Sequence, residues 1–177
     1  MIYKIIDNVL PKSVADKIAE DLLFDARFPW YYNSSVDYPK NSPEDIKNDN
    51  LNNYQFTHTF YQNYNITGLF SIVAPIVNYL NPESILSIKA NLNPRTETRN
   101  PFNFHTDFES KSTDRKTAIY YVNSNDGVTI FEDGTEIESI ANRLLIFDQK
   151  TYHTGTTCTN QKIRCLINLN YIELRND

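Results

Sequence analysis

Short apolar segments separated by turn residues fill the chain after Pro82 and limit the folds that it can adopt. Each segment is rich in β-branched or aromatic residues and is too short for a typical helix. Asn125-Asp126-Gly127 and Asp133-Gly134 are typical turn sequences between strands. A succession of short strands of this kind predicts an antiparallel sandwich or barrel. The expected strands cover 85–92, 117–123, 128–131, 143–147 and 163–171.

The first part of the chain has the pattern of an amphipathic helix. Ser13 is expected to cap its start, because a hydroxyl can accept a hydrogen bond from a free backbone N–H, and Asp16 complements the positive helix end. Val14, Ile18 and Leu22 then form a one-sided apolar stripe. The stripe predicts that this helix packs on a flat partner.

Further elements are expected before Pro82. Short strands are predicted at 2–6 and 55–61, and a helix at 69–80 that Pro75 kinks or interrupts. The polar stretch 31–53 contains two prolines and few aliphatic residues, so it is predicted to be a long, lid-like loop. Helices followed by a run of strands predict an α+β fold, mainly β, in which the helices buttress one face of the sandwich or barrel.

Length and composition exclude several classes of protein. The 177 residues are expected to form a single domain. The net charge of −5 and the pI of about 5.2 give no basic footprint for nucleic acid or anionic membranes. Neither a signal peptide nor a membrane span is expected, since the apolar runs are too short. Two cysteines, Cys158 and Cys165, form no disulfide framework, so a reducing, cytoplasmic compartment is expected.

Two of the chain's three histidines belong to a pattern with metal-binding chemistry. His105 and Asp107 are two residues apart, and on a strand such residues point to the same face. His153 follows a later predicted strand. Two histidines and one carboxylate are the facial triad of non-haem Fe(II) sites, and the same ligands can hold a catalytic zinc ion.

A cation on the last predicted strand separates these two interpretations. Arg164 lies on an otherwise apolar strand that has no acidic residue before Glu173. A buried guanidinium is costly to desolvate and needs a carboxylate or phosphate partner, so Arg164 is predicted to bind a carboxylate from outside the chain. Lys162, two positions earlier on the same face, is the second candidate for this role.

The order His105-x-Asp107, His153, Arg164 resembles that of the Fe(II)/2-oxoglutarate-dependent dioxygenases of prolyl-4-hydroxylase-like type. Segments 104–108 and 152–157 are most similar to small oxygenases encoded by bacteriophages, especially marine ones. One position departs from the prolyl hydroxylases, because Asn93 stands before Pro94 where many of them have a tyrosine. The other segments that carry the resemblance are 7–10, 117–123, 127–131 and 142–147.

The resemblance implies a fold and a set of roles. The fold would be a double-stranded β-helix, or cupin-like jelly roll, in which residues 84–175 form the catalytic part and residues 1–83 add helical support and the loop. His105, Asp107 and His153 would bind Fe(II). Arg164 would bind the distal carboxylate of 2-oxoglutarate, with a hydrogen bond from Tyr121.

The implied reaction is hydroxylation by O2, with decarboxylation of 2-oxoglutarate to succinate and CO2 and with ascorbate in support. The substrate stays open between a peptidyl proline, a free amino acid and another small molecule. Two alternatives remain: a catalytically silent, cupin-like metal-binding module and a zinc-dependent hydrolase. A phage-encoded protein of this kind would work in the host cytoplasm.

Overall fold

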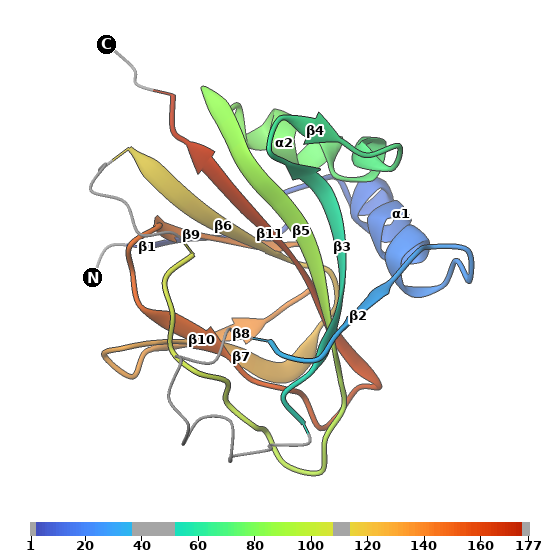
Figure 1. Cartoon of the computed structure of the whole chain (residues 1–177), viewed down its shortest axis with the longest axis vertical. Helices are drawn as coiled ribbons and strands as arrows, with labels where there is room; N and C mark the ends of the chain where they lie inside the picture. Colours follow the sequence, from blue (N-terminus) through green and yellow to red (C-terminus); the bar gives the residue numbers. More distant parts are fainter. Residues whose placement is uncertain (1–2, 37–51, 108–113, 175–177) are drawn as a thin grey trace.

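Two antiparallel sheets face each other and enclose the interior of the molecule (Figure 1). The structure, a computed structural model, describes residues 3–36, 52–107 and 114–174. The large sheet has the order β1 (Tyr3–Ile6), β9 (Arg143–Asp148), β6 (Arg115–Tyr121), β11 (Ile163–Ile172), β5 (Ser84–Pro94), β3 (Gln55–Gln62) and β2 (Tyr31–Asn33), and β4 (Asn65–Ile66) pairs with β3. The small sheet has the order β10 (His153–Gly155), β7 (Asn125–Phe131) and β8 (Glu136–Ser139).

Helices α1 (Lys12–Leu23) and α2 (Ala74–Leu80) lie on the outer side of the large sheet (Figure 1). The predicted cap at Ser13 is wrong: α1 begins at Lys12, after Pro11, and no side chain caps it. The helix predicted at 69–80 is interrupted, as one of the two expectations for Pro75 had it, but the break lies before the proline, between the 3-10 turn η1 (Phe70–Ile72) and α2. Pro75 lies in the first turn of α2, where backbone N–H groups have no hydrogen-bond partner within the helix, so its lack of an N–H costs nothing.

The alternation of side chains along the strands creates two apolar cores. On β11, Cys165, Ile167 and Leu169 face the helices, whereas Arg164 and Leu166 face the small sheet. Burial of both faces explains why this strand reads as a continuous apolar run. The core between the sheets consists of Ile119, Tyr121, Phe131, Ile137, Leu145, Phe147 and Leu166.

Residues from the first half of the chain complete the large sheet. β1 pairs with β9, and β3 pairs with β5, so residues on both sides of position 84 contribute to it. The predicted loop 31–53 contains β2 at its start, and its residues 37–51 lie outside the described ranges. Four short strands were not predicted: β2, β4, β8 and β10. They have two to four residues each, and none has an aliphatic pair like Ile5-Ile6 of the similarly short β1, which was predicted.

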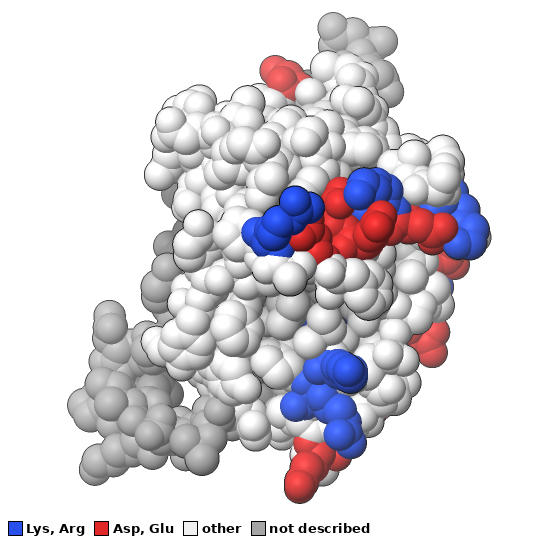
Figure 2. All heavy atoms as spheres, turned by 90° about the vertical axis from the view of Figure 1, so that its right-hand side faces the viewer, with Lys and Arg blue, Asp and Glu red and all other residues white. Residues whose placement is uncertain are grey.

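The exposed side of α1 carries charges of both signs that pair with one another (Figure 2). The bridges Lys12–Asp16 and Lys17–Asp21 span one helical turn at 2.6 and 2.7 Å. This face therefore presents no extended positive surface to phosphates, in agreement with the overall acidic charge. Within the described residues, no helix has the length and apolar character needed to cross a membrane.

Asn142 fastens the segment before α1 to the start of β9. Its Oδ1 accepts a hydrogen bond from the Leu10 N–H at 3.0 Å, and its Nδ2 donates to the Leu10 carbonyl at 2.8 Å. Its backbone φ of 62° lies in the left-handed region, which asparagine tolerates better than most residues. One buried side chain thus satisfies both backbone groups of a core residue.

We expect Asn142→Gly to lower the free energy of unfolding by about 2 kcal/mol, because the two Leu10 groups lose their partners. Asn142→Ala should cost about 1 kcal/mol more, since alanine also resists the left-handed backbone. Urea denaturation of the three proteins measures both effects. Variants as stable as the parent chain would show that Asn142 does not hold the segment.

Candidate metal centre and cavity

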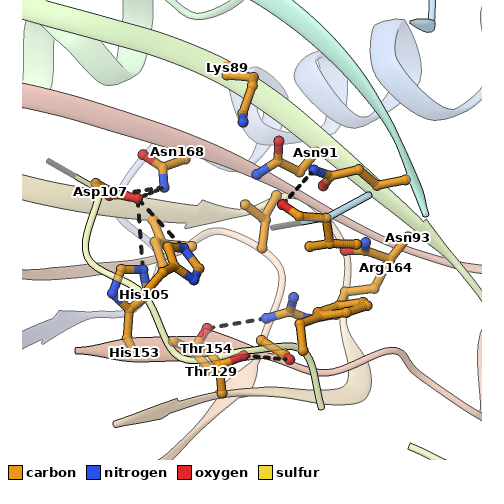
Figure 3. A pocket seen from close by; sticks show the side chains of 16 residues that line it. Lys89, Asn91, Asn93, His105, Asp107, Thr129, His153, Thr154, Arg164 and Asn168 are labelled. Atoms are coloured by element: carbon orange, nitrogen blue, oxygen red, sulfur yellow. Dashed lines mark hydrogen bonds and ion pairs between the residues drawn. The ribbon is translucent and has the colours of Figure 1, made fainter. Parts of the chain in front are cut away.

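Three potential metal ligands converge at one end of the space between the sheets (Figure 3). Asp107 Oδ1 lies 3.9 Å from His105 Nε2 and 4.0 Å from His153 Nε2. Two facial ligand atoms with bonds of about 2.1 Å to one ion lie about 3 Å apart, so an ion would draw these side chains together by about 1 Å. Nitrogen and carboxylate ligands in this number match a facial triad.

The local structure around the triad differs from the prediction. His105 and Asp107 do not lie on a regular strand. His105 forms an isolated bridge with His153, with reciprocal backbone hydrogen bonds of 3.0 Å, and Asp107 follows in a bend. The bend, not the alternation of a strand, brings the carboxylate alongside the imidazoles.

Backbone carbonyls fix the tautomers of both histidines. His153 Nδ1 lies 3.0 Å from the Thr151 carbonyl, and His105 Nδ1 lies 3.2 Å from the Asn103 carbonyl. A carbonyl only accepts, so each Nδ1 carries the proton and each Nε2 has a free lone pair in the neutral ring. Burial lowers the pKa of His153, with partial opposition from Asp107, and this favours the neutral ring that metals bind.

Hydrogen bonds hold the other oxygen of Asp107 in place. Its Oδ2 lies 2.8 Å from the Thr117 hydroxyl and accepts from Asn168 Nδ2 at 3.3 Å. Asn170 Nδ2 donates to Asn168 Oδ1 at 2.9 Å, and Gln149 Nε2 donates to Asn170 Oδ1 at 3.0 Å. A buried polar network therefore directs Oδ1 toward the histidines.

Arg164 is fully buried on β11, away from the triad (Figure 3). Its Nε donates to Ser139 Oγ at 3.0 Å, and its Nη2 donates to Thr129 Oγ1 at 3.2 Å. No carboxylate forms an ion pair with it in the part of the chain that the structure describes. Burial lowers the pKa of Arg164, because the desolvated guanidinium has no anion beside it.

Two glycines make room for the Arg164 side chain. A Cβ at Gly127 would lie 2.6 Å from Arg164 Cδ, and one at Gly155 would lie 3.1 Å from Arg164 Nη1. The first contact is shorter than any real Cβ contact, so the arginine could not keep this position beside an alanine. The small sheet is thus shaped around the guanidinium, through β7 and β10.

Tyr121 contacts Arg164 indirectly. Its hydroxyl donates to Thr129 Oγ1 at 2.8 Å, and its ring lies 5.9 Å from the guanidinium carbon. Thr129 Oγ1 thereby accepts from both Tyr121 and Arg164, so its own proton remains to donate to a further group. Thr129 is among the residues that line the cavity, and Tyr121 is not. The direct hydrogen bond from Tyr121 to 2-oxoglutarate therefore stays a prediction.

A polar row on β5 forms another side of the cavity, of about 90 Å³. Of this row, Asn93 was singled out from the sequence, whereas Lys89 and Asn91 were not. Lys89, Asn91 and Asn93 alternate with the buried Ile88 and Ala90 (Figure 3). The sequence signal that could have identified the row is the alternation of polar and apolar residues along this strand.

The pairing of β5 with β11 sets this row beside the proposed cosubstrate site. Asn93 lies opposite Arg164, and Lys89 lies opposite Asn168. The other cation considered, Lys162, is exposed in the turn before β11 and does not line the cavity. Its assignment as an inward-facing strand residue is wrong, because the strand starts only at Ile163.

The third histidine has a structural position. His58 is buried, its Nδ1 donates to the Pro29 carbonyl at 2.9 Å, and its ring packs against Phe28 and Phe60. It does not line the cavity.

Comparison with known proteins gives matches of structure only. No protein-family model matches the sequence, and the search of curated proteins gave no match. The non-heme alpha ketoglutarate dependent epimerase SnoN from nogalamycin biosynthesis aligns with a TM-score of 0.66 at 14% identity, over 97% of this chain and 78% of that one. Another SnoN structure is a complex with Fe3+, alpha ketoglutarate and nogalamycin RO.

Two prolyl hydroxylases also align. The enzyme from Trichoplax adhaerens, in complex with a hypoxia inducible factor peptide, has a TM-score of 0.62 at 16% identity, over 97% of this chain and 83% of that one. A prolyl-4-hydroxylase from Pseudomonas putida has a TM-score of 0.58 at 13% identity, over 98% and 92%. The chain has the fold of these enzymes. The predicted α+β, mainly β, jelly roll is confirmed.

Thr117 Oγ1 lies 2.8 Å from both Asp107 Oδ2 and Asn170 Oδ1, and its single proton favours the charged carboxylate. We therefore expect Thr117→Val to weaken binding of a divalent metal about 10- to 100-fold, because Asp107 Oδ2 loses this hydrogen bond while the side-chain volume is kept. Calorimetric titration with Co(II) measures the affinity. Thr67→Val is the matched control, since the buried Thr67 hydroxyl has no hydrogen-bond partner among the described residues. Equal affinities for the two variants would contradict a role for Thr117 in orienting the carboxylate.

Proposed function

We propose that this protein is an Fe(II)- and 2-oxoglutarate-dependent dioxygenase that hydroxylates a substrate of the host cell. His105, Asp107 and His153 hold the iron, and their donor set suits it: two neutral imidazole nitrogens and one carboxylate oxygen, each fixed by hydrogen bonds. Iron there supplies the redox chemistry that couples oxidation of 2-oxoglutarate by O2 to hydroxylation, with succinate and CO2 as the other products.

The observation that carries the proposal is the buried Arg164. A guanidinium that is 2% exposed and has only hydroxyl acceptors among the described residues is a site for an exogenous carboxylate. Its place across the cavity from the triad suits a dicarboxylate that reaches from the arginine to the metal (Figure 3). Thr129 donates its remaining proton to the same carboxylate.

The alternatives fit the cavity less well. A zinc hydrolase needs a general base beside the metal, yet Asp107 is the sole carboxylate among the described residues that line the cavity, and it belongs to the triad. A silent module has no use for a buried arginine around which two glycines are fitted. The fold neighbours named for alpha ketoglutarate dependence add support at the level of fold.

The finer features of the proposal follow from the sequence resemblance. The sequence similarity to phage-encoded oxygenases supports a location in the cytoplasm of an infected host, where thiols such as Cys158 and Cys165 would stay reduced. Ascorbate would keep the iron ferrous during turnover.

The decisive experiment measures 2-oxoglutarate binding and succinate formation. We expect the parent protein with Fe(II), 2-oxoglutarate, O2 and ascorbate to form succinate, and the anaerobic metal-loaded protein to bind 2-oxoglutarate in a calorimeter. His105→Ala should lose both, because one metal ligand is missing. A protein that binds Zn(II) but never 2-oxoglutarate would favour the hydrolase, and one that binds 2-oxoglutarate without forming succinate would favour the silent module.

Arg164→Met should weaken 2-oxoglutarate binding at least about 30-fold while Co(II) binding persists, because a buried charge–charge contact is lost away from the metal ligands. Lys162→Met is the matched control and should bind 2-oxoglutarate like the parent, since Lys162 is exposed outside the cavity. If Lys162→Met were the variant that lost affinity, the assignment of Arg164 would be wrong.

Gly127→Ala should weaken 2-oxoglutarate binding about tenfold or more and cost about 1–3 kcal/mol of unfolding free energy, because its Cβ displaces the Arg164 stem. Gly68→Ala controls for the loss of glycine itself, since nothing lies within 4 Å of a Cβ at that position. Calorimetry and urea denaturation of both variants check the expectation. Unchanged 2-oxoglutarate affinity in Gly127→Ala would show that the arginine site does not depend on this close contact.

A further inference from the structure

Lys89 is a second cation in the cavity, and the proposed binding of iron and 2-oxoglutarate does not use it. Its ammonium points into the cavity from β5 (Figure 3). Within the described ranges it forms neither an ion pair nor a hydrogen bond. Its strand partner is Asn168, which donates to the metal ligand Asp107, so the ammonium lies at the metal end of the cavity.

Charge balance favours one more anion at this site. A divalent metal, Arg164 and Lys89 bring four positive charges against the single negative charge of Asp107, and the two imidazoles are neutral as ligands. The dianion 2-oxoglutarate removes two of the three excess charges. One positive charge is left, and Lys89 is the cation without an assigned partner.

A neighbouring amide adds a second binding feature. Asn91 lies two residues from Lys89 on the same face of β5, about 7 Å along the strand. Its Oδ1 is buried and has no hydrogen-bond partner among the described residues. A buried carbonyl oxygen of this kind favours a ligand N–H. An anionic group and an N–H donor a few bonds apart would therefore satisfy both side chains.

We propose, building on the proposed function, that Lys89 binds the carboxylate of the primary substrate, and that this substrate is an α-amino acid or a chain-terminal residue with a free α-carboxylate. Lys89 holds the carboxylate and Asn91 accepts from the neighbouring nitrogen. The contact anchors the molecule beside the metal, so a carbon of the side chain, close to the carboxylate, receives the hydroxyl group.

The test uses the protein loaded with Zn(II) and 2-oxoglutarate. This form can bind a substrate but cannot turn it over, because Zn(II) is not redox-active. Saturation-transfer NMR is recorded with three probe mixtures: the twenty L-amino acids, their C-terminal amides and their N-acetyl derivatives. We expect signals from members of the first mixture and at least about tenfold weaker binding of the same members as amides, because the amide lacks the charge that Lys89 binds. Signals from N-acetyl derivatives as well would assign the carboxylate to a chain terminus.

Two substitutions examine the lysine itself. Lys89→Met should abolish the amino-acid signals while the dissociation constant of 2-oxoglutarate changes less than about threefold, and Lys89→Arg should restore them in part because the positive charge returns. Lys162→Met is the control for loss of a lysine outside the cavity and should give the parent's signals. Thermal unfolding shows whether each variant is folded.

Three results would overturn the proposal. Amides could bind as well as acids, no amino acid or derivative could bind to the loaded protein, or Lys89→Met could weaken 2-oxoglutarate as strongly as the amino acid. The last result would assign Lys89 to the cosubstrate's metal-bound carboxylate. Failure of the proposed function looks different, because the metal-loaded parent would then not bind 2-oxoglutarate at all.

Discussion

The side-chain alternation of the paired strands β5 and β11 is the constraint on which the rest of the molecule depends. On both strands one face must be apolar, because α1 and α2 cover it, and this face includes Ile88 and Ile167. The opposite face is thereby free to carry polar groups. Because the two strands are paired in register, Arg164 meets Asn93 and Asn168 meets Lys89. A shift by one residue would bury these groups under the helices and expose the core to the cavity.

The sequence predicted the longer strands of the second half well, since each has enough β-branched or aromatic residues to stand out. The N-terminal helix was also predicted, although its start was not, because Ser13 falls inside a helix that begins one residue earlier. A strand of three residues such as β10 shows no period of its own and forms because a partner strand pairs with it. Its prediction requires knowledge of the tertiary structure.

The candidate site was predicted in its ligand types and order but not in its supports. His105, Asp107, His153 and Arg164 were identified because histidine is rare and an arginine is unusual on an apolar strand. Thr117 and the amides behind Asp107 were missed, since threonine and asparagine occur throughout the sequence and a single one gives no signal. Such residues become informative only when a fold brings them to a carboxylate.

The charges around Lys89 indicate how this site would respond to a bound metal. A cation on a half-buried strand face is costly to desolvate unless an anion is near. Burial lowers the pKa of Lys89, and the charge of Asp107 opposes this lowering only in part. A carboxylate bound to a metal shares its charge with that ion. Metal binding therefore weakens the support that Asp107 gives to the ammonium. In the proposed function, the metal-loaded site would therefore favour an anion more strongly than the metal-free protein. Binding of the proposed anionic substrate would then be coupled to prior binding of the metal.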